Sequence, residues 1–328
     1  MVVRPEDVRY LCFSGGGIRG ISYAYALDEL EKLLRFDFGR IKGVVGTSAG
    51  ALYAAAIAAG MSTQEMLRIA KSTDIQNLCT IDYMMNAHLL FTKWGLATQD
   101  QLIAYIDSFL GDSMITLSDL YQRTGKLLIV CVTNLNTNCA EYWSHETHPE
   151  MSVARAVATS MALPPVFTPT LLDGCTFVDG GLVDNFPCHI FPQQHTLCFR
   201  VKWGSLKQHQ IDGVQKYFSR ITYAMLTGLE RAKFERMDAA SHTITIDCGD
   251  TATFTWQVEP ATRSLLQSCG RAAVRNFVLQ HDLHALSVSK KKTECPEEKT
   301  SDHCSNGGEQ NTGNKGTCAA HPTCECAN

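Results

Sequence analysis

The stretch YLCFSGGGIRGISYAY, residues 10–25, decides the fold of this chain. Three glycines follow an apolar run typical of a buried strand, and the residues after them have the pattern of a helix. Glycine at such a strand-to-helix turn lets an anion approach backbone N–H groups that a side chain would otherwise shield. The sequence therefore predicts an anion-binding turn at one end of a sheet.

Further apolar runs alternate with helical patterns along the chain. IKGVVG (41–46) precedes an alanine-rich helix, and KLLIVCVTN (126–134) has the β-branched composition of another strand. Strongly apolar strands separated by helices are typical of a parallel sheet covered on both faces. We therefore predict an α/β fold, a three-layer α/β/α sandwich with a mainly parallel central sheet. Later elements of this fold are strands at TLCFRVKW (196–203) and SHTITID (241–247) and a last helix opened by Pro260.

The domain organisation follows from two changes in pattern. Apolar residues at three- and four-residue steps predict a long amphipathic helix that completes the same domain; they are Val214, Phe218, Ile221, Met225 and Leu229. From about residue 287 the chain becomes rich in charge, Gly, Asn and Thr, and such a segment cannot bury enough surface to offset its ordering entropy. We expect one folded domain over residues 1–286 and a disordered, cysteine-containing polar tail over residues 287–328.

Composition excludes several classes of protein. The 328 residues carry a formal net charge of -4, which gives no reason to expect a nucleic-acid partner. The polar N-terminus and the absence of a long apolar run predict a cytoplasmic protein, with any membrane contact peripheral. Most cysteines lie in apolar runs, as small buried residues in a reducing compartment do. The tail cysteines match no standard zinc spacing, so we predict no metal and no cofactor.

The glycine turn has two interpretations. GGGIRG, from Gly15 to Gly20, satisfies the G-x-G-x-x-G pattern of a dinucleotide site and stands between a strand and a helix. That site requires an acidic residue at the end of the next strand, to hold a ribose hydroxyl. Asp37 comes before that strand rather than after it, so a dinucleotide-dependent oxidoreductase is a remote alternative.

The next strand ends instead in GTSAG, from Gly46 to Gly50. Small residues around a serine between a strand and a helix are the setting of a nucleophile elbow, with Ser48 as the nucleophile. Neighbouring parallel strands place both turns at the same end of the sheet, so the anion is an oxyanion stabilised by the N–H groups of Gly16 and Gly17. Arg19 either fixes this loop and adds positive potential or is a solvated residue in the first helical turn.

The general base has three candidates. His189 and His195 follow an apolar segment in a late position, but neither stands in a strong turn signature. Asp179 ends an apolar strand in TFVDGGLVDNFP, and the two glycines behind it allow a carboxylate to approach another group. An ordinary Asp-Gly turn is the alternative for Asp179, and Asp184 has the setting of a turn residue.

These motifs resemble the patatin-like phospholipase family. SGGGIRG (14–20), GTSAG (46–50) and DGG (179–181) match its three signatures in order and spacing, and ARAVATSMALPPVFTP is similar to its lead-in to the aspartate. The resemblance covers residues 9 to about 195. It implies that residues 1–286 are a patatin-like catalytic domain with a Ser-Asp dyad and no catalytic histidine.

The resemblance also implies roles for the site residues and a function. Ser48 is then the nucleophile, Asp179 the general base, and the loop of Gly15, Gly16 and Gly17, with Arg19, the oxyanion hole. The expected activity is that of a lipid acyl hydrolase of phospholipase A, lysophospholipase or acylglycerol lipase type, with a lipid ester as substrate at a membrane or lipid-droplet surface. The alternative is a catalytically silent lipid-binding or scaffold protein with the same fold.

One apolar stretch has two open interpretations. Residues 80–96 contain Met84, Met85, Leu89, Leu90, Phe91 and Trp94. They form either an acyl pocket or lid or plain core packing, because Met and aromatic residues fill cores more often than they mark sites.

Overall fold

The computed structural model describes residues 4–72, 86–111, 114–202, 211, 213–234, 242–249 and 258–283. The strands are β1 (Tyr10–Phe13), β2 (Gly43–Thr47), β3 (Leu127–Asn134), β4 (Cys139–Trp143), β5 (Thr170–Leu172), β6 (Cys175–Asp179), β7 (Thr196–Lys202) and β8 (Thr243–Asp247). The α-helices are α1 (Ile21–Leu34), α2 (Ala49–Ala58), α3 (Thr63–Ser72), α4 (Ala87–Lys93), α5 (Asp100–Leu110), α6 (Leu117–Thr124), α7 (Val153–Ser160), α8 (Gly181–Asp184), α9 (Val214–Phe234) and α10 (Pro260–Gln280). Short 3₁₀ helices are η1 (Pro5–Asp7), η2 (Gly17–Gly20), η3 (Phe38–Arg40) and η5 (Gln193–His195). The predicted tail, residues 287–328, lies outside the described residues.

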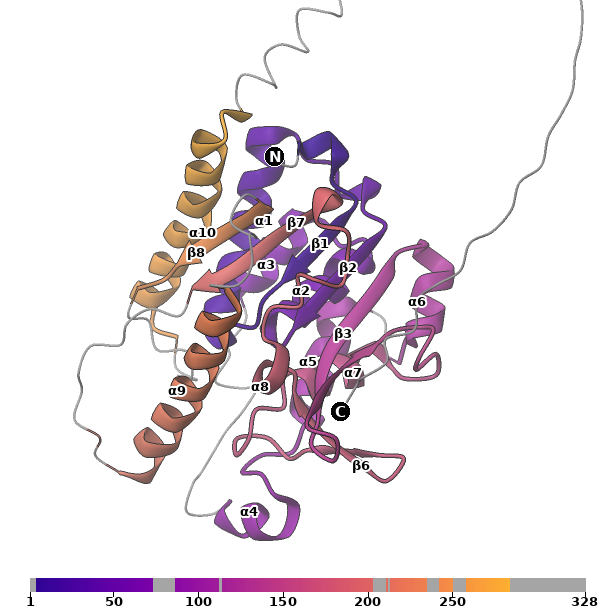
Figure 1. The fold of residues 1–328 in the computed structure, drawn as a ribbon, viewed down its shortest axis with the longest axis vertical. Helices are drawn as coiled ribbons and strands as arrows, with labels where there is room; N and C mark the ends of the chain where they lie inside the picture. Colours follow the sequence, from indigo (N-terminus) through magenta and orange to yellow (C-terminus); the bar gives the residue numbers. More distant parts are fainter. Residues whose placement is uncertain are drawn as a thin grey trace, which may run out of the picture.

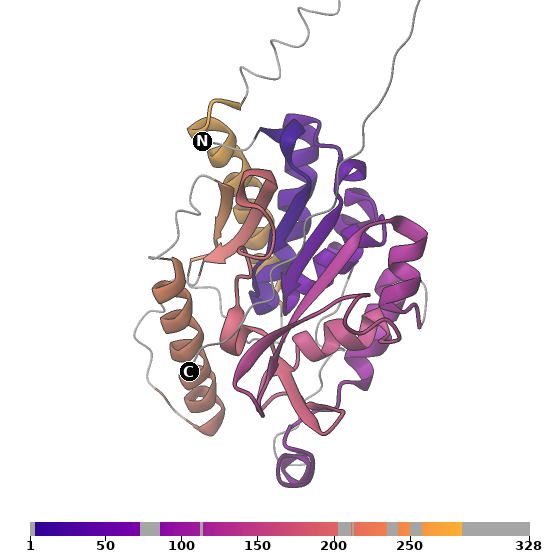
Figure 2. The ribbon, with the colours of Figure 1, turned by 45° about the vertical axis from the view of Figure 1, so that its right-hand side comes forward.

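A mixed sheet runs through the middle of the molecule (Figure 1). Its strand order is β5-β6-β3-β2-β1-β7-β8, with β4 also paired to β3. Strands β3, β2, β1, β7 and β8 are parallel to one another, and β4, β5 and β6 pair in antiparallel fashion. Helices flank this sheet (Figures 1 and 2), so the predicted α/β fold is confirmed.

The strands predicted from apolar runs coincide with β1, β2, β3, β7 and β8. Every residue of β2 is buried, because side chains on both faces of a central parallel strand are covered and must be apolar or small. Leu11, Phe13 and Val44 belong to the large core, to which α1 and α2 contribute. The alternate side chains, Cys12 and Val45, belong to a second, small core closed by the chain that follows α8.

The helices at the two ends of the chain pack against each other. The predicted helix after the glycine turn is α1, and Pro260 stands in the first turn of α10 as predicted. Within α10, Phe277 and other apolar residues of the predicted face are buried. Arg271 and Arg275 of α10 donate hydrogen bonds to Glu29 of α1, at 2.6 and 2.7 Å. The end of the described chain is therefore tied to its beginning.

Helix α9 differs from its prediction in the face it buries. Ile221, Met225 and Leu229 of the predicted apolar face are exposed, whereas Leu226, a position of the other face, is buried against Gly181 of α8. The helix therefore packs on the domain with a narrow face and leaves an apolar stripe outward.

Candidate active site

Ser48 occupies a strained turn between β2 and α2. Its φ of 53° and ψ of -127° lie in a region that residues other than glycine rarely adopt, and neighbouring structure must hold a residue there. Because α2 begins with the next residue, the positive end of its dipole lies at Ser48 and favours negative charge there. The backbone thus presents the serine hydroxyl at a sharp strand-to-helix turn, as the sequence predicts.

The glycines of GTSAG permit two backbones to approach closely. A Cβ added at Gly46 would lie 2.5 Å from the carbonyl oxygen of Gly50, and one added at Gly50 would lie 2.5 Å from the carbonyl oxygen of Ser14. Either contact is shorter than van der Waals packing allows. These glycines therefore let α2 turn back against β2 and rest on the end of β1, beside the glycine turn.

Strand β3 brings Asp179 to Ser48. On β3, Cys131 pairs with Thr47 at the end of β2, and Val132 pairs with Asp179 at the end of β6. Strand β4 pairs with both of these β3 residues and so occupies the other edge of β3. Since a strand has only two edges, β2 and antiparallel β6 share one edge and meet there with their carboxyl ends facing each other.

The serine and the aspartate form a hydrogen bond in this gap. Ser48 Oγ donates to Asp179 Oδ2 at 2.8 Å, and the backbone N–H of Gly181 donates to Asp179 Oδ1 at 2.8 Å. Asp179 is 4% exposed. Burial raises the pKa of its carboxyl to about 7, and the bonds from Gly181 and Ser48 oppose that rise. A carboxylate with this pKa accepts a proton at neutral pH more readily than an exposed aspartate does.

The predicted glycine loop lies beside this pair. The N–H of Gly15 donates to the backbone oxygen of Asn185 at 3.0 Å, so this N–H is already engaged. Gly17 has a φ of +53°, which only glycine adopts at little cost. Among the described residues, neither the N–H of Gly16 nor that of Gly17 donates a hydrogen bond. These two groups are the donors that the loop can offer to an anion.

Arg19 does not lie in solvent. Its side chain is fully buried, and its guanidinium donates to the backbone oxygen of Lys202, at the end of β7, at 3.1 Å. The interpretation of Arg19 as a solvated residue in the first helical turn is therefore wrong. A buried guanidinium must be hydrogen-bonded to offset its desolvation. The bond to Lys202 meets part of this need and joins the glycine loop to β7.

Two residues that sequence reasoning missed hold the turns in place. Ser160, at the end of α7, accepts the N–H of Ser48 at 2.8 Å and donates its own hydroxyl to the backbone oxygen of Cys131 at 2.6 Å. Asn185 clamps Gly15 from both sides, because its side chain also donates to the backbone oxygen of Gly15 at 3.3 Å. Ser160 lies in ARAVATSMALPPVFTP and Asn185 in TFVDGGLVDNFP. No spacing rule marks the role of either residue.

The other candidate bases lie elsewhere. His195 Nδ1 is 3.1 Å from the backbone oxygen of Asp7. His189 lies 3.7 Å from Asp184, a buried carboxylate that accepts the hydroxyl of Tyr142 at 2.7 Å. Asp184 also accepts a hydrogen bond from the N–H of Phe186 at 3.2 Å, so it is a turn residue whose carboxylate is buried. The contacts described for these histidines are with Asp7 for His195 and with Tyr142 and Asp184 for His189.

The stretch around residues 80–96 is only partly described, and Met84 and Met85 lie outside the described residues. Phe91 is 81% exposed and Trp94 is 58% exposed, so core packing is wrong for these two side chains. Their prediction as part of a lid stays a prediction.

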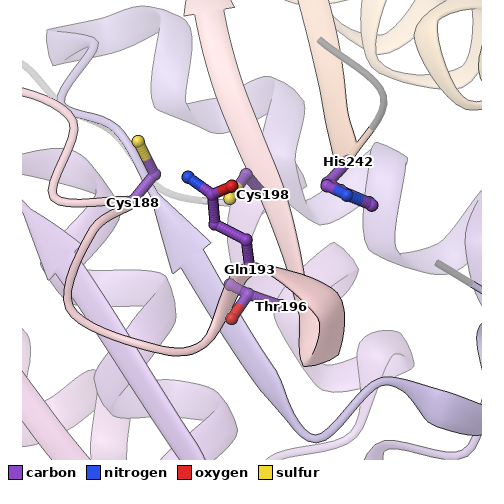
Figure 3. Close-up of a pocket in the computed structure, with 5 residues that line it drawn as sticks. All are labelled: Cys188, Gln193, Thr196, Cys198 and His242. Atoms are coloured by element: carbon purple, nitrogen blue, oxygen red, sulfur yellow. The ribbon is translucent and has the colours of Figure 1, made fainter. Parts of the chain in front are cut away.

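Among the described residues, no group of three His, Cys, Asp or Glu side chains could hold a metal ion, and no helix is long and apolar enough to cross a membrane. A pocket at the start of β7 contains none of the predicted site residues (Figure 3). It is lined by Cys188, Gln193, Thr196, Cys198 and His242.

Comparisons with known proteins agree with the fold. The profile of the patatin-like phospholipase family matches residues 11–192. YqhO of Bacillus subtilis (strain 168) is 34% identical over 199 residues, which are 56% of this chain and 66% of YqhO. The probable lipid hydrolase 463L of Invertebrate iridescent virus 6 is 26% identical over 203 residues, 59% of this chain and 66% of that protein. The crystal structure of VipD from Legionella pneumophila matches with a TM-score of 0.58 and 20% identity, covering 84% of this chain and 67% of that one.

The fold and the turn at Ser48 define an α/β protein with a half-buried serine on a strand-to-helix elbow. The family profile covers more than half of the chain and includes all three motifs. The chain belongs to the patatin-like phospholipase family. It spans slightly less than two thirds of the length of the two curated relatives named above.

Proposed function

We propose that this protein is a lipid acyl hydrolase that cleaves carboxylic esters through an acyl-enzyme on Ser48. The observation that carries the proposal is the 2.8 Å hydrogen bond from Ser48 Oγ to the buried carboxylate of Asp179. Family membership and the similarity to a probable lipid hydrolase support a lipid as the substrate. Phospholipase A, lysophospholipase and acylglycerol lipase activities all use this chemistry.

In the first half of the reaction, Ser48 Oγ attacks the ester carbonyl and its proton passes to Asp179. The bond from carbonyl carbon to the leaving oxygen then breaks, and Asp179 returns the proton to the departing alcohol or lysolipid. In the second half, Asp179 takes a proton from water, whose oxygen attacks the acyl group and releases a fatty acid while Ser48 regains its proton. No other proton carrier is required.

The negative charge on the carbonyl oxygen needs donors that are already in place. The N–H groups of Gly16 and Gly17 fill this role in the proposal, and the N-terminus of α2 adds positive potential at the same point. Gly15 contributes through the shape of the loop, since its own N–H is bonded to Asn185. Arg19 acts as the anchor of the loop.

The domain boundary is part of the proposal. We place the catalytic domain at residues 1–286, because the sheet is continuous from β5 to β8 and α10 packs on α1. The matched family is that of the hydrolase interpretation, not of the dinucleotide alternative. A catalytically silent scaffold with this fold is separated from a hydrolase by the experiment below.

The test is labelling by a fluorophosphonate probe, which reacts with activated serines. We expect wild-type protein to be labelled and both Ser48→Ala and Asp179→Asn to lose labelling, with Ser268→Ala in α10 as a control that keeps it. Turnover of a soluble short-chain p-nitrophenyl ester is measured in parallel. If wild-type protein is neither labelled nor active beside an active control esterase, the silent scaffold is the better account.

A further inference from the structure

The outer face of α9 is unusual for a helix at a protein surface. Among the side chains that the structure describes between residues 217 and 229, the exposed ones are apolar or small, and the larger of them form a stripe at four-residue steps. This stripe consists of Tyr217, Ile221, Met225 and Leu229, each at least 40% exposed. A solvent-facing helix normally carries charged residues there, and a contiguous exposed apolar patch marks an interaction site.

A second exposed apolar group lies on α4. Phe91 and Trp94 are the most exposed large apolar side chains of this segment, and exposed Lys93 stands between them. The chain after them is anchored, because Leu96 N donates to Pro165 O at 2.9 Å and Ala97 N to Val166 O at 2.8 Å. The aromatic pair is thus presented from a fixed point next to the segment that leads from α7 to β5.

In Figure 1, α9 runs along the lower left side of the molecule and α4 lies below the rest of the fold. Helix α8 begins two residues after Asp179, and α9 packs on it through Leu226, which contacts Gly181. We call Phe91, Trp94, Tyr217, Ile221, Met225 and Leu229 the apolar end. Its α9 part thus belongs to a helix that packs on α8, directly after Asp179.

We infer that the apolar end docks the protein on the surface of a phospholipid bilayer. The inference rests on the proposed function, because a lipid acyl hydrolase must meet a substrate that is held in such a surface. Amphipathic helices bind there by inserting apolar and aromatic side chains, helped by basic residues that attract anionic lipid. The sequence of α9 carries four basic residues and one acidic residue, and Lys93 adds a positive charge on α4, against a chain whose net charge is -4.

The charge of α9 distinguishes a bilayer from a second copy of the chain as the partner of the apolar end. In a two-fold dimer formed through α9, this basic helix would face the same basic helix of the second copy, whereas anionic lipid brings complementary charge. Tyr and Trp are the residues found at the boundary between headgroups and acyl chains, because each has an apolar ring and a polar atom. The bilayer therefore fits the apolar end better than another protein surface does.

The test measures binding of the full 328-residue chain to vesicles by co-sedimentation. The vesicles contain phosphatidylcholine with phosphatidylglycerol as a minority component, and Ser48→Ala protein is used so that the lipid is not consumed. Two variants are made in this background, the double variant Ile221→Gln/Met225→Gln and the single variant Phe91→Gln. Each is expected to weaken vesicle binding about tenfold or more, because apolar area that the bilayer would bury is lost. Gln is a good helix former and the positions are exposed, and thermal unfolding checks that each variant is folded.

The matched control is Leu279→Gln, an equally conservative change at a 68% exposed leucine. Leu279 lies in the last turn of α10, which ends at the other end of the molecule (Figures 1 and 2), so its vesicle binding is expected to equal that of the parent. Failure of the parent to bind, or equal binding by all folded variants, overturns the inference. So does a dimer in size-exclusion chromatography that the α9 variants dissociate, without vesicle binding.

Soluble-ester turnover by wild-type protein separates this inference from the proposed function. Turnover without vesicle binding leaves the hydrolase standing and removes the docking surface. Vesicle binding without turnover or probe labelling keeps a lipid-docking face and removes the hydrolase.

Discussion

Replacing Asp179 by asparagine is expected to stabilise the folded protein while it abolishes turnover. The carboxyl group is buried, and its pKa rises from 3.8 to about 7 on folding. Because the folded-state pKa is the higher one, the protonated group favours folding below pH 3.8, and this stability is lost as the pH rises through about 7. The complete loss is about 4 kcal/mol, at 1.36 kcal/mol for each pKa unit.

Asparagine keeps the shape and removes the charge. Its oxygen can accept from the Gly181 N–H and its amide can donate to Ser48 Oγ, so both hydrogen bonds of the neutral aspartic acid are retained. We expect the free energy of unfolding of Asp179→Asn to exceed that of wild type by about 4 kcal/mol at pH 8 and by about 2 kcal/mol at pH 5.

Urea denaturation followed by tryptophan fluorescence measures this difference at each pH. Asp173→Asn is the control, since Asp173 is exposed in a positive-φ turn that asparagine also accepts. The result that contradicts the reasoning is an Asp179→Asn variant whose advantage over wild type is the same at pH 5 and pH 8. In that case burial does not raise the pKa of this carboxyl.

Two further predictions concern turnover of a soluble ester. Because Asp179 must be ionised to accept the proton of Ser48, kcat/KM is expected to fall about tenfold for each pH unit below about 7; a pH–rate profile that is flat from pH 5 to 8 contradicts this base. Ser160→Ala leaves the N–H of Ser48 without its acceptor, so we expect a loss of about 1–3 kcal/mol in stability and a lower kcat with little change in KM. Thermal unfolding and steady-state kinetics measure both effects, and equal kcat in Ser160→Ala and wild type would remove the positioning role.

Most of the fold was predictable from short segments of the sequence. The strands β1, β2, β3, β7 and β8 are apolar on both faces, so short windows of sequence reveal them. Strands β4 and β5 were not predicted, because CAEYW and TLL are short and half-exposed and gain their order from pairing with neighbours. The outward stripe of α9 was also missed, since periodicity shows that a helix has an apolar face but not what covers it.

The candidate site also contains residues that the sequence predicts and residues that it does not. Ser48 and Asp179 stand in turns whose glycines are visible in the sequence, and the structure brings the two side chains together. Ser160 joins Ser48 across 112 residues and Asn185 joins Gly15 across 170, and contacts of that range have no local signature. The burial of Arg19 could not be read from its position in a first helical turn either, because neighbouring strands determine it.

The shared edge of β3 has a consequence for how this chain can vary in length. Ser48 and Asp179 are 131 positions apart, yet both are fixed by the pairing of their strands with Cys131 and Val132, adjacent residues of one strand. Loops that lie between them can gain or lose residues without moving either group, as long as these pairings hold. A single-residue deletion within β3, in contrast, would shift one partner by about 3.3 Å relative to the other and break their hydrogen bond.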